Sequence, residues 1–185
     1  MLSRKKVFLV GALLLILSLL VPAALGASVH LKGGKNAKPT FADNGLTLNA
    51  MGALSGLGNE DVLITLNAMA DVTAVCTVPS GANEAPGQNP APISVTGSQA
   101  IPAPEVDNGN TPFNVTTVAP PSEIAGAPDC PNGNWTETIT DLAFTSATLI
   151  VEQPAGTVVL TVTCTFSQPT SDGIVPKQQV SCSSS

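Results

Sequence analysis

The most informative stretch of the sequence is residues 62–78, which read VLITLNAMADVTAVCTV. Every even position in it is apolar or cysteine, whereas the odd positions include Thr65, Asn67 and Thr73. Successive side chains of a β-strand point to opposite faces, so this pattern predicts a strand with one face in a core and one in solvent. Because the run is longer than an ordinary strand, we expect a bend or a corner near Ala68 to Asp71.

Two later segments have the same character. From Val158 to Phe166 the even positions are apolar or cysteine, and threonines stand between them. Residues Thr136 to Glu152 are rich in Thr, Ile and Val, but the phase of alternation changes near Ser146, which predicts a bulge or two strands meeting. Shorter candidate strands are Leu46 to Ala50, Ile93 to Thr96, Pro112 to Val118 and Gln178 to Cys182.

Turn-forming residues separate these runs, as in Asp43-Asn44-Gly45 and Ser171-Asp172-Gly173, and no helical period of useful length appears. Seven to nine short strands joined by loops predict an all-β fold, an antiparallel β-sandwich. The resemblance to an immunoglobulin domain is loose, because the chain has no tyrosine and Trp135 follows closely after Cys130.

The first 26 residues have the three parts of a secretion signal. Arg4, Lys5 and Lys6 are basic, an apolar run follows from Val7 to Val21, and small residues come next. We therefore expect a signal peptide over 1–26, an extended lead-in over 27–40 and a single domain over 41–185. An uncleaved membrane anchor is the alternative, because the apolar run continued to Gly26 approaches the roughly 20 residues that span a bilayer.

The charge balance limits the partners. The sequence has thirteen acidic and seven basic residues, and three of the basic ones lie in the predicted signal peptide. Four lysines remain, Lys32, Lys35, Lys38 and Lys177. So few cations exclude binding to nucleic acid through its phosphates. The acidity is typical of a solvated surface, with calcium binding as the less favoured interpretation.

The four cysteines form an even set in a chain predicted to be exported, which indicates two disulfides. Their spacing does not suit zinc. We favour Cys76 with Cys130 and Cys164 with Cys182, since the last two lie at the end of one strand and in the next candidate strand. Cys76 with Cys164 is the rival pairing, because both fall on the inward phase of long strands.

Several blocks resemble a family of uncharacterised secreted bacterial proteins. They include Gly45-Leu46-Thr47-Leu48-Asn49-Ala50, the strand ending in Cys76, Ala85-Pro86-Gly87-Gln88-Asn89-Pro90 and the Cys130-Pro131-Asn132 turn before Trp135. The resemblance implies an exported β-rich domain with Cys76 and Cys130 paired. It implies no activity, cofactor or partner.

Catalytic arrangements are missing from the sequence, so we predict that the chain is not an enzyme. His30 is the only histidine and lies in the lead-in, so the sequence offers no credible Ser/His or Cys/His arrangement. Glu60-Asp61 and the pair Glu137 and Asp141 supply carboxylates, but one tryptophan and no tyrosine give little platform for a sugar ring. We interpret Glu60 and Asp61 as loop acids and Trp135 as a core plug or loop anchor.

One metal hypothesis concerns the processed N-terminus. A cut after Ala27 would leave Ser28-Val29-His30, and a histidine third from a free amine can hold copper(II) or nickel(II). A cut after Gly26, which we favour, removes this motif, and an exposed histidine is the simpler interpretation. No cofactor is expected.

The function predicted from the sequence is a non-enzymatic, secreted or cell-surface protein with a structural or adhesive role and no assigned partner. Two alternatives are a small-ligand or metal-ion binding module and a subunit that self-associates by donating Ser28 to Lys32 to a neighbour's sheet. After signal cleavage no membrane association is expected.

Overall fold

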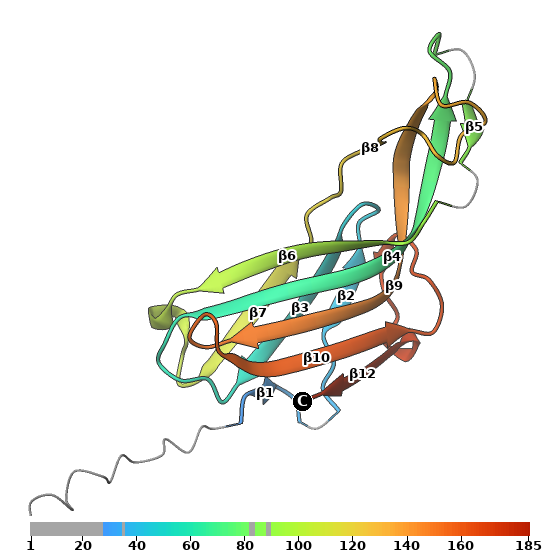
Figure 1. Cartoon of the computed structure of the whole chain (residues 1–185). Coiled ribbons are helices and arrows are strands. Elements are labelled where there is room, and N and C mark those ends of the chain that lie inside the picture. The colour runs from blue at the N-terminus through green and yellow to red at the C-terminus, as the bar shows by residue number, and fades with distance from the viewer. Residues whose placement is uncertain (1–27, 35, 82–83, 88–89) are drawn as a thin grey trace, which may run out of the picture.

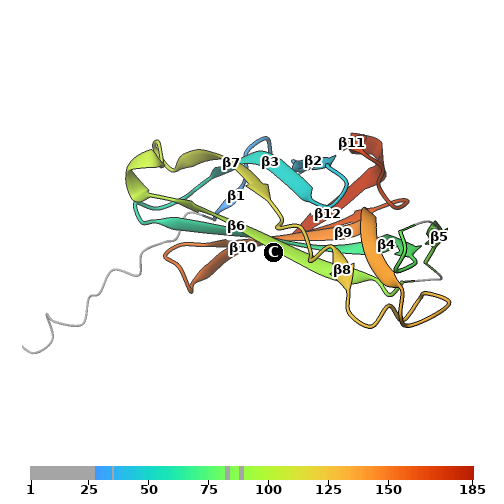
Figure 2. The same ribbon diagram turned by 90° about the horizontal axis from the view of Figure 1, so that it is seen from above.

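The structure is a computed structural model that describes residues 28–34, 36–81, 84–87 and 90–185. The predicted signal peptide, 1–26, lies outside the described residues. The described chain is all-β, and its strands form two antiparallel sheets that pack face to face as a β-sandwich (Figures 1 and 2). The predicted fold class is confirmed.

The first sheet has β3 at its centre. Its strands are β1 (His30–Leu31), β2 (Thr40–Asp43), β3 (Leu48–Ser55), β7 (Asn110–Thr116) and β11 (Gly173–Ile174). The strand β7 pairs with one side of β3, while β1 and β2 follow each other along its other side, and β11 pairs with β2.

The second sheet is built on the long strands β4 and β9. Its strands are β4 (Val62–Thr77), β5 (Glu84–Pro86), β6 (Ile93–Ile101), β8 (Glu123–Ile124), β9 (Thr136–Glu152), β10 (Val158–Phe166) and β12 (Val180–Ser184). Two 3-10 turns, η1 (Ala103–Glu105) and η2 (Lys177–Gln179), complete the described elements.

The core lies where the alternation predicts it. Along β4 the residues at even positions from Val62 to Ala70 are buried, whereas Met69 and Asp71 are exposed. They pack against side chains of the first sheet such as Phe41 and Leu48. Burial of one apolar face of each sheet is the main stabilising contribution to such a sandwich.

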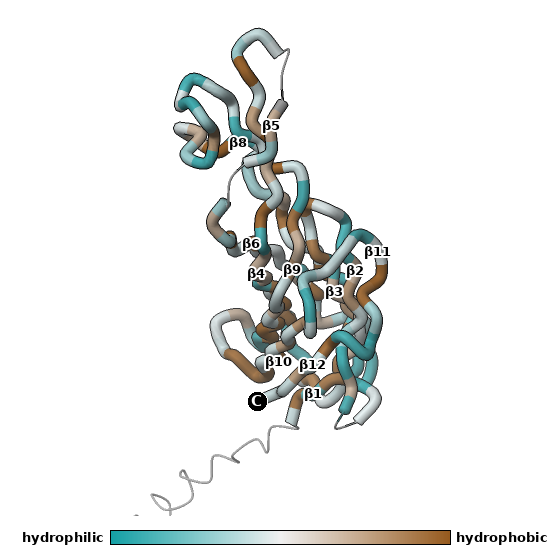
Figure 3. The backbone as a smooth tube through the Cα atoms, turned by 90° about the vertical axis from the view of Figure 1, so that its right-hand side faces the viewer, coloured by the Kyte–Doolittle hydropathy of each residue, from teal (hydrophilic) through white to brown (hydrophobic). Residues whose placement is uncertain are grey.

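The strands β4 and β9 are longer than the sandwich. Beside the first sheet they are flanked by β6 and β10, and beyond it by the short strands β5 and β8. This projecting part is called the arm and comprises residues 71–78, 84–87 and 119–141. Figures 1 and 3 show it extending upward from the sandwich.

Two bulges lie at the bend. The pairing of β4 with β9 shifts between Met69 and Ala70 and again between Thr73 and Ala74. The extra residues are on β9, Thr145 in the first shift and Thr140 in the second. A bulge bends a strand and increases its twist, so these shifts account for the turn of the arm. The predicted bend in β4 and the phase change near Ser146 are both confirmed.

Twelve strands are present in the described residues, more than the seven to nine predicted. The additional ones include β1, β5, β8 and β11, each of two or three residues. Such short strands contain too few residues for an alternating pattern, and each pairs with a neighbouring strand that is longer than itself.

The disulfides join Cys76 to Cys130 and Cys164 to Cys182, the pairing that the sequence favours. The first ties β4 to the loop before β9 within the arm, and the second ties β10 to β12. The rival pairing of Cys76 with Cys164 does not occur. Both residues are buried, but β9 lies between their strands β4 and β10, and Cys76 lies out in the arm, so the two residues are farther apart than a disulfide reaches.

One edge of the sandwich is closed by direct backbone contact. The amide of Val118, just after β7, donates a hydrogen bond to the Thr96 carbonyl of β6 at 2.9 Å. Next to it Gly97 faces inward, and a Cβ added there would lie 1.9 Å from the Thr116 carbonyl oxygen. Only glycine therefore allows the two sheets to meet here.

Gly97→Ala should destabilise the fold strongly. The added methyl group meets backbone, which cannot rotate away, so we expect a loss of about 3 kcal/mol in the free energy of unfolding, measured by urea denaturation. Ser98→Ala, at the neighbouring exposed position, is the matched control and should change it by less than about 0.5 kcal/mol. Equal effects from both substitutions would contradict the close contact.

Removing the arm disulfide should loosen the arm and leave the sandwich folded. In the double variant Cys76→Ser and Cys130→Ser, amides of residues 125–135 lose their covalent tie to β4 and should exchange with deuterium markedly faster. Amides of β10 should keep their protection. Global unfolding of the variant in the absence of denaturant would show that the two parts fold as one unit.

Candidate functional site

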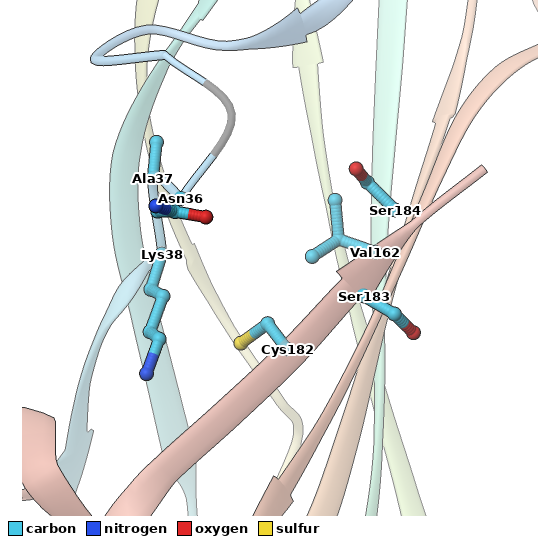
Figure 4. A pocket seen from close by; sticks show the side chains of 7 residues that line it. All are labelled: Asn36, Ala37, Lys38, Val162, Cys182, Ser183 and Ser184. Atoms are coloured by element: carbon cyan, nitrogen blue, oxygen red, sulfur yellow. The ribbon is translucent and has the colours of Figure 1, made fainter.

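The edge opposite Gly97 is open and forms a groove. The loop between β1 and β2 faces β12 across this edge, with Asn36, Ala37 and Lys38 on one wall and Cys182, Ser183 and Ser184 on the other (Figure 4). Two further hollows share Ala37 with the first, and the three measure about 510, 460 and 410 Å³. These three hollows together are called the lysine groove.

Two glycines shape the loop wall of the groove. Lys32 donates its amide to the Ala53 carbonyl at 2.8 Å, which continues the pairing of β1 with β3. The chain then turns at Gly33 and Gly34, whose φ angles of 121° and 92° lie in the left-handed region that glycine adopts without strain. The Ala37 amide closes the turn by donating to the Gly34 carbonyl at 2.9 Å.

Each lysine that the structure describes lines the groove. Lys32 and Lys38 come from the loop, and Lys177 comes from η2. All three side chains are exposed, and the Lys38 ammonium donates a hydrogen bond to the Val180 carbonyl of β12. Lys35 lies outside the described residues. The sequence has no basic residue from 39 to 176. The lysines of the described residues are therefore all gathered at this groove, although the chain as a whole is acidic.

His30 lies in β1 and also lines the groove. Its Nδ1 is 2.7 Å from the Ser28 carbonyl oxygen. The copper hypothesis depends on a free amine at Ser28, and the cut that would create it falls beside residues outside the described part. Among the described residues no group of three or more His, Cys, Asp or Glu side chains is arranged to hold a metal ion.

The predicted carboxylate pairs are not brought together as a catalytic site. Glu60 and Asp61 are exposed, and Asp61 accepts a hydrogen bond from the Ala103 amide at 2.8 Å, as expected for a loop acid. Glu137 is fully buried in the arm opposite Cys76, and its Oε2 accepts from the Asp129 amide at 3.3 Å. Asp141 lies at the bend instead. The bulge at Thr140 separates them, so the spacing of four residues does not place the two acids together.

Trp135 is half-buried in the loop before β9. Its amide donates to the Asn132 carbonyl at 3.0 Å, and the Asn134 amide donates to the Asn132 side chain at 3.0 Å. This tight turn follows the Cys76–Cys130 disulfide, and the interpretation of Trp135 as a core plug or loop anchor stays a prediction.

A buried carboxylate at the bend was not found by sequence reasoning. Asp43, at the end of β2, is 2% exposed and accepts hydrogen bonds from the Gly45 amide at 3.0 Å and from the Thr170 hydroxyl. The same hydroxyl accepts from the Phe144 amide at 2.8 Å. The Leu142 amide donates to the Gly45 carbonyl at 3.1 Å. At this point β9 no longer pairs with β10 and does not yet pair with β8. The Thr170 hydroxyl and the Gly45 carbonyl therefore accept the hydrogen bonds that a neighbouring strand would otherwise accept from β9.

Burial raises the pKa of Asp43 above its ordinary value of 3.8, since a charge is poorly solvated there. The hydrogen bonds from Thr170 and Gly45 act in the opposite direction, and the negative charges of Asp141 and Asp172 raise the pKa further. The residues of this cluster lie far apart in the sequence, and no local pattern marks them.

No family model, curated protein or solved structure matches this chain significantly. Within the described residues no helix has the length and apolar character needed to span a membrane. The fold and the site therefore define a disulfide-bonded β-sandwich that carries a cationic groove at its open edge. The resemblance to secreted bacterial proteins stays a prediction.

Asp43→Asn should change how stability depends on pH. Because the pKa of Asp43 is raised in the fold, the folded chain holds this proton to higher pH than the unfolded chain. The stabilising contribution is therefore complete below pH 3.8 and is lost as the pH rises through the folded pKa. The variant cannot titrate at this position, so wild-type stability relative to the variant should fall as the pH rises above 3.8.

Urea denaturation of both proteins across this pH range measures the difference. Asp71→Asn, which removes an exposed acid from β4, is the control for the loss of one negative charge. Parallel curves for wild type and Asp43→Asn would contradict the assignment.

Proposed function

We propose that this protein is an exported, non-enzymatic β-sandwich with a structural or adhesive role, which attaches to an anionic partner through the lysine groove. The observation that carries the proposal is the convergence of Lys32, Lys38 and Lys177 on one concave edge. Lys38 and Lys177 are separated by nearly the whole domain in sequence, so only the fold brings them together.

The groove suits carboxylate, sulfate or phosphate groups. An exposed ammonium contributes little by itself, because water and salt screen it. Several ammonium groups along one groove act together on a partner that carries several anions, and the combined affinity exceeds that of any single contact. A polymeric or extended anionic partner therefore fits better than a single small ion.

Export is supported by the two disulfides. Such bonds persist in oxidising surroundings outside the cytoplasm, and the basic, apolar and small-residue parts of segment 1–26 match a secretion signal. A domain outside the cytoplasm needs resistance to unfolding. The disulfides within the arm and between β10 and β12 supply it.

Self-association by a donated lead-in is the less favoured alternative. In the described structure His30 and Leu31 are paired with Ser55 and Leu54 of their own β3. Donation would require this pairing to be released. It would also bring the lysines of the lead-in toward a groove that already carries positive charge.

Neutralising the groove should abolish binding to an anionic polymer. For the variant Lys32→Gln, Lys38→Gln and Lys177→Gln we expect loss of binding to fluorescently labelled polyglutamate, measured by fluorescence anisotropy at low salt. Wild-type binding should weaken as salt is added.

The control changes the net charge equally and leaves the groove intact. Ser94→Glu, Ser98→Glu and Ala100→Glu place three negative charges at exposed positions of β6, at the opposite edge of the second sheet. This variant should retain most of the binding. If it loses as much as the lysine variant, overall charge and not the groove governs the interaction, and the proposal is wrong.

A further inference from the structure

The strand β12 forms one wall of the groove and is an edge strand. It is the first strand in the order of its sheet and pairs with β10 alone. Ser185 and Thr161 exchange both of their backbone hydrogen bonds, at 2.9 and 3.0 Å. In an antiparallel pair such exchanging positions alternate with positions that do not bond across the ladder.

The register then shows which backbone groups of β12 face the groove. Ser183 with Thr163 and Ser181 with Thr165 have the same phase as Ser185 with Thr161, so they bond to β10. Val180, Cys182 and Ser184 have the other phase, and the short Cα–Cα distance of 4.1 Å between Cys182 and Cys164 agrees with it. Their amide and carbonyl groups therefore point away from β10, toward the groove.

Two of these outward groups have a partner among the described residues, and both belong to Val180, whose amide donates to the Lys177 carbonyl. The Val180 carbonyl accepts the hydrogen bond from Lys38. The outward amides and carbonyls of Cys182 and Ser184 have no backbone or side-chain partner in the described part of the chain. The groove thus combines a free strand edge with lysines beside it.

We infer that the lysine groove receives an extended acidic peptide segment, which adds to the edge of β12 as a further strand. This inference rests on the proposed function and names the class of partner. A peptide in extended form offers a donor and an acceptor at every second residue, which matches the free groups of Cys182 and Ser184. Its side chains alternate, so acids at every second position share one face that the lysines can neutralise.

The charges at the edge select among possible strands. Lysine beside a free edge opposes pairing with uncharged or basic edges, a common protection against edge-to-edge association. The β12 strand of a second copy has no acidic residue, and a neighbour's lead-in carries lysines. Only an acidic segment can form hydrogen bonds with the free backbone groups of β12 and also be attracted by the ammonium groups of the lysines.

The test uses the exported full-length domain with its disulfides intact and two labelled octapeptides of alternating Glu and Val. One peptide is unmodified, and the other is N-methylated at every residue, so that it keeps its charge but has no amide to donate along either edge. Fluorescence anisotropy at low salt should show that the unmodified peptide binds about tenfold more tightly or better. Equal affinity for both peptides overturns strand addition.

A matched pair of variants tests the same point on the protein. Ser184→Pro removes an amide that points into the groove and makes no bond to β10, and proline is tolerated at such an edge position. Ser184→Ala keeps the amide. We expect the proline variant to weaken binding of the unmodified peptide about tenfold and the alanine variant to leave it within about twofold.

The outcomes separate this inference from the proposed function. If polyglutamate and both octapeptides bind equally to wild type and to Ser184→Pro, binding depends on charge alone, and strand addition is wrong while the anionic groove stands. If none of them binds wild type, both fail. A dimer of wild type that Ser184→Pro converts to a monomer, seen by light scattering, would make a second copy the occupant and also overturn the inference.

Discussion

The pairing of β4 with β9 is the interaction on which the rest of the molecule depends. These two strands run through the centre of the second sheet and continue into the arm, so a single ladder belongs to both parts. Where the flanking strands change, the ladder has its two bulges and β9 has no strand on one side. The buried hydrogen bonds of Asp43 and Thr170 occupy that gap. The burial of a titratable carboxylate at the bend is thus a consequence of the same two strands running through both the sandwich and the arm.

The two edges of the sandwich differ for a physical reason. At Gly97 the absence of a side chain lets backbone approach backbone, and the edge is sealed. At the other edge β12 and the loop after β1 remain apart, and polar groups line the space between them. The Cys164–Cys182 disulfide fixes β12 to β10, so this five-residue strand stays in place although it has a neighbour on one side only.

The sequence predicts those features that have a local pattern. Alternation identifies the core face of β4, the inward direction of Cys76 and Cys164, and the change of phase at the bulge beside Ser146. It does not predict short strands such as β8, because two residues contain no period. The contact of Asp43 with Thr170 and the approach of Lys177 to Lys38 depend on the tertiary fold, and the spacing of these residues along the chain carries no signal. Counting the lysines gave the charge of the chain but not its distribution.

That distribution explains how a free strand edge can persist in a chain with so few charges. An unprotected edge such as Val180–Ser184, which contains no charged side chain, would pair with its own copies. The chain has few cations with which to prevent this, and the fold places the described ones at this edge, where Lys38 already occupies one carbonyl. The same ammonium groups that repel a basic or neutral edge attract an acidic one. Protection of the edge and selection of its partner are therefore two effects of one arrangement of charge.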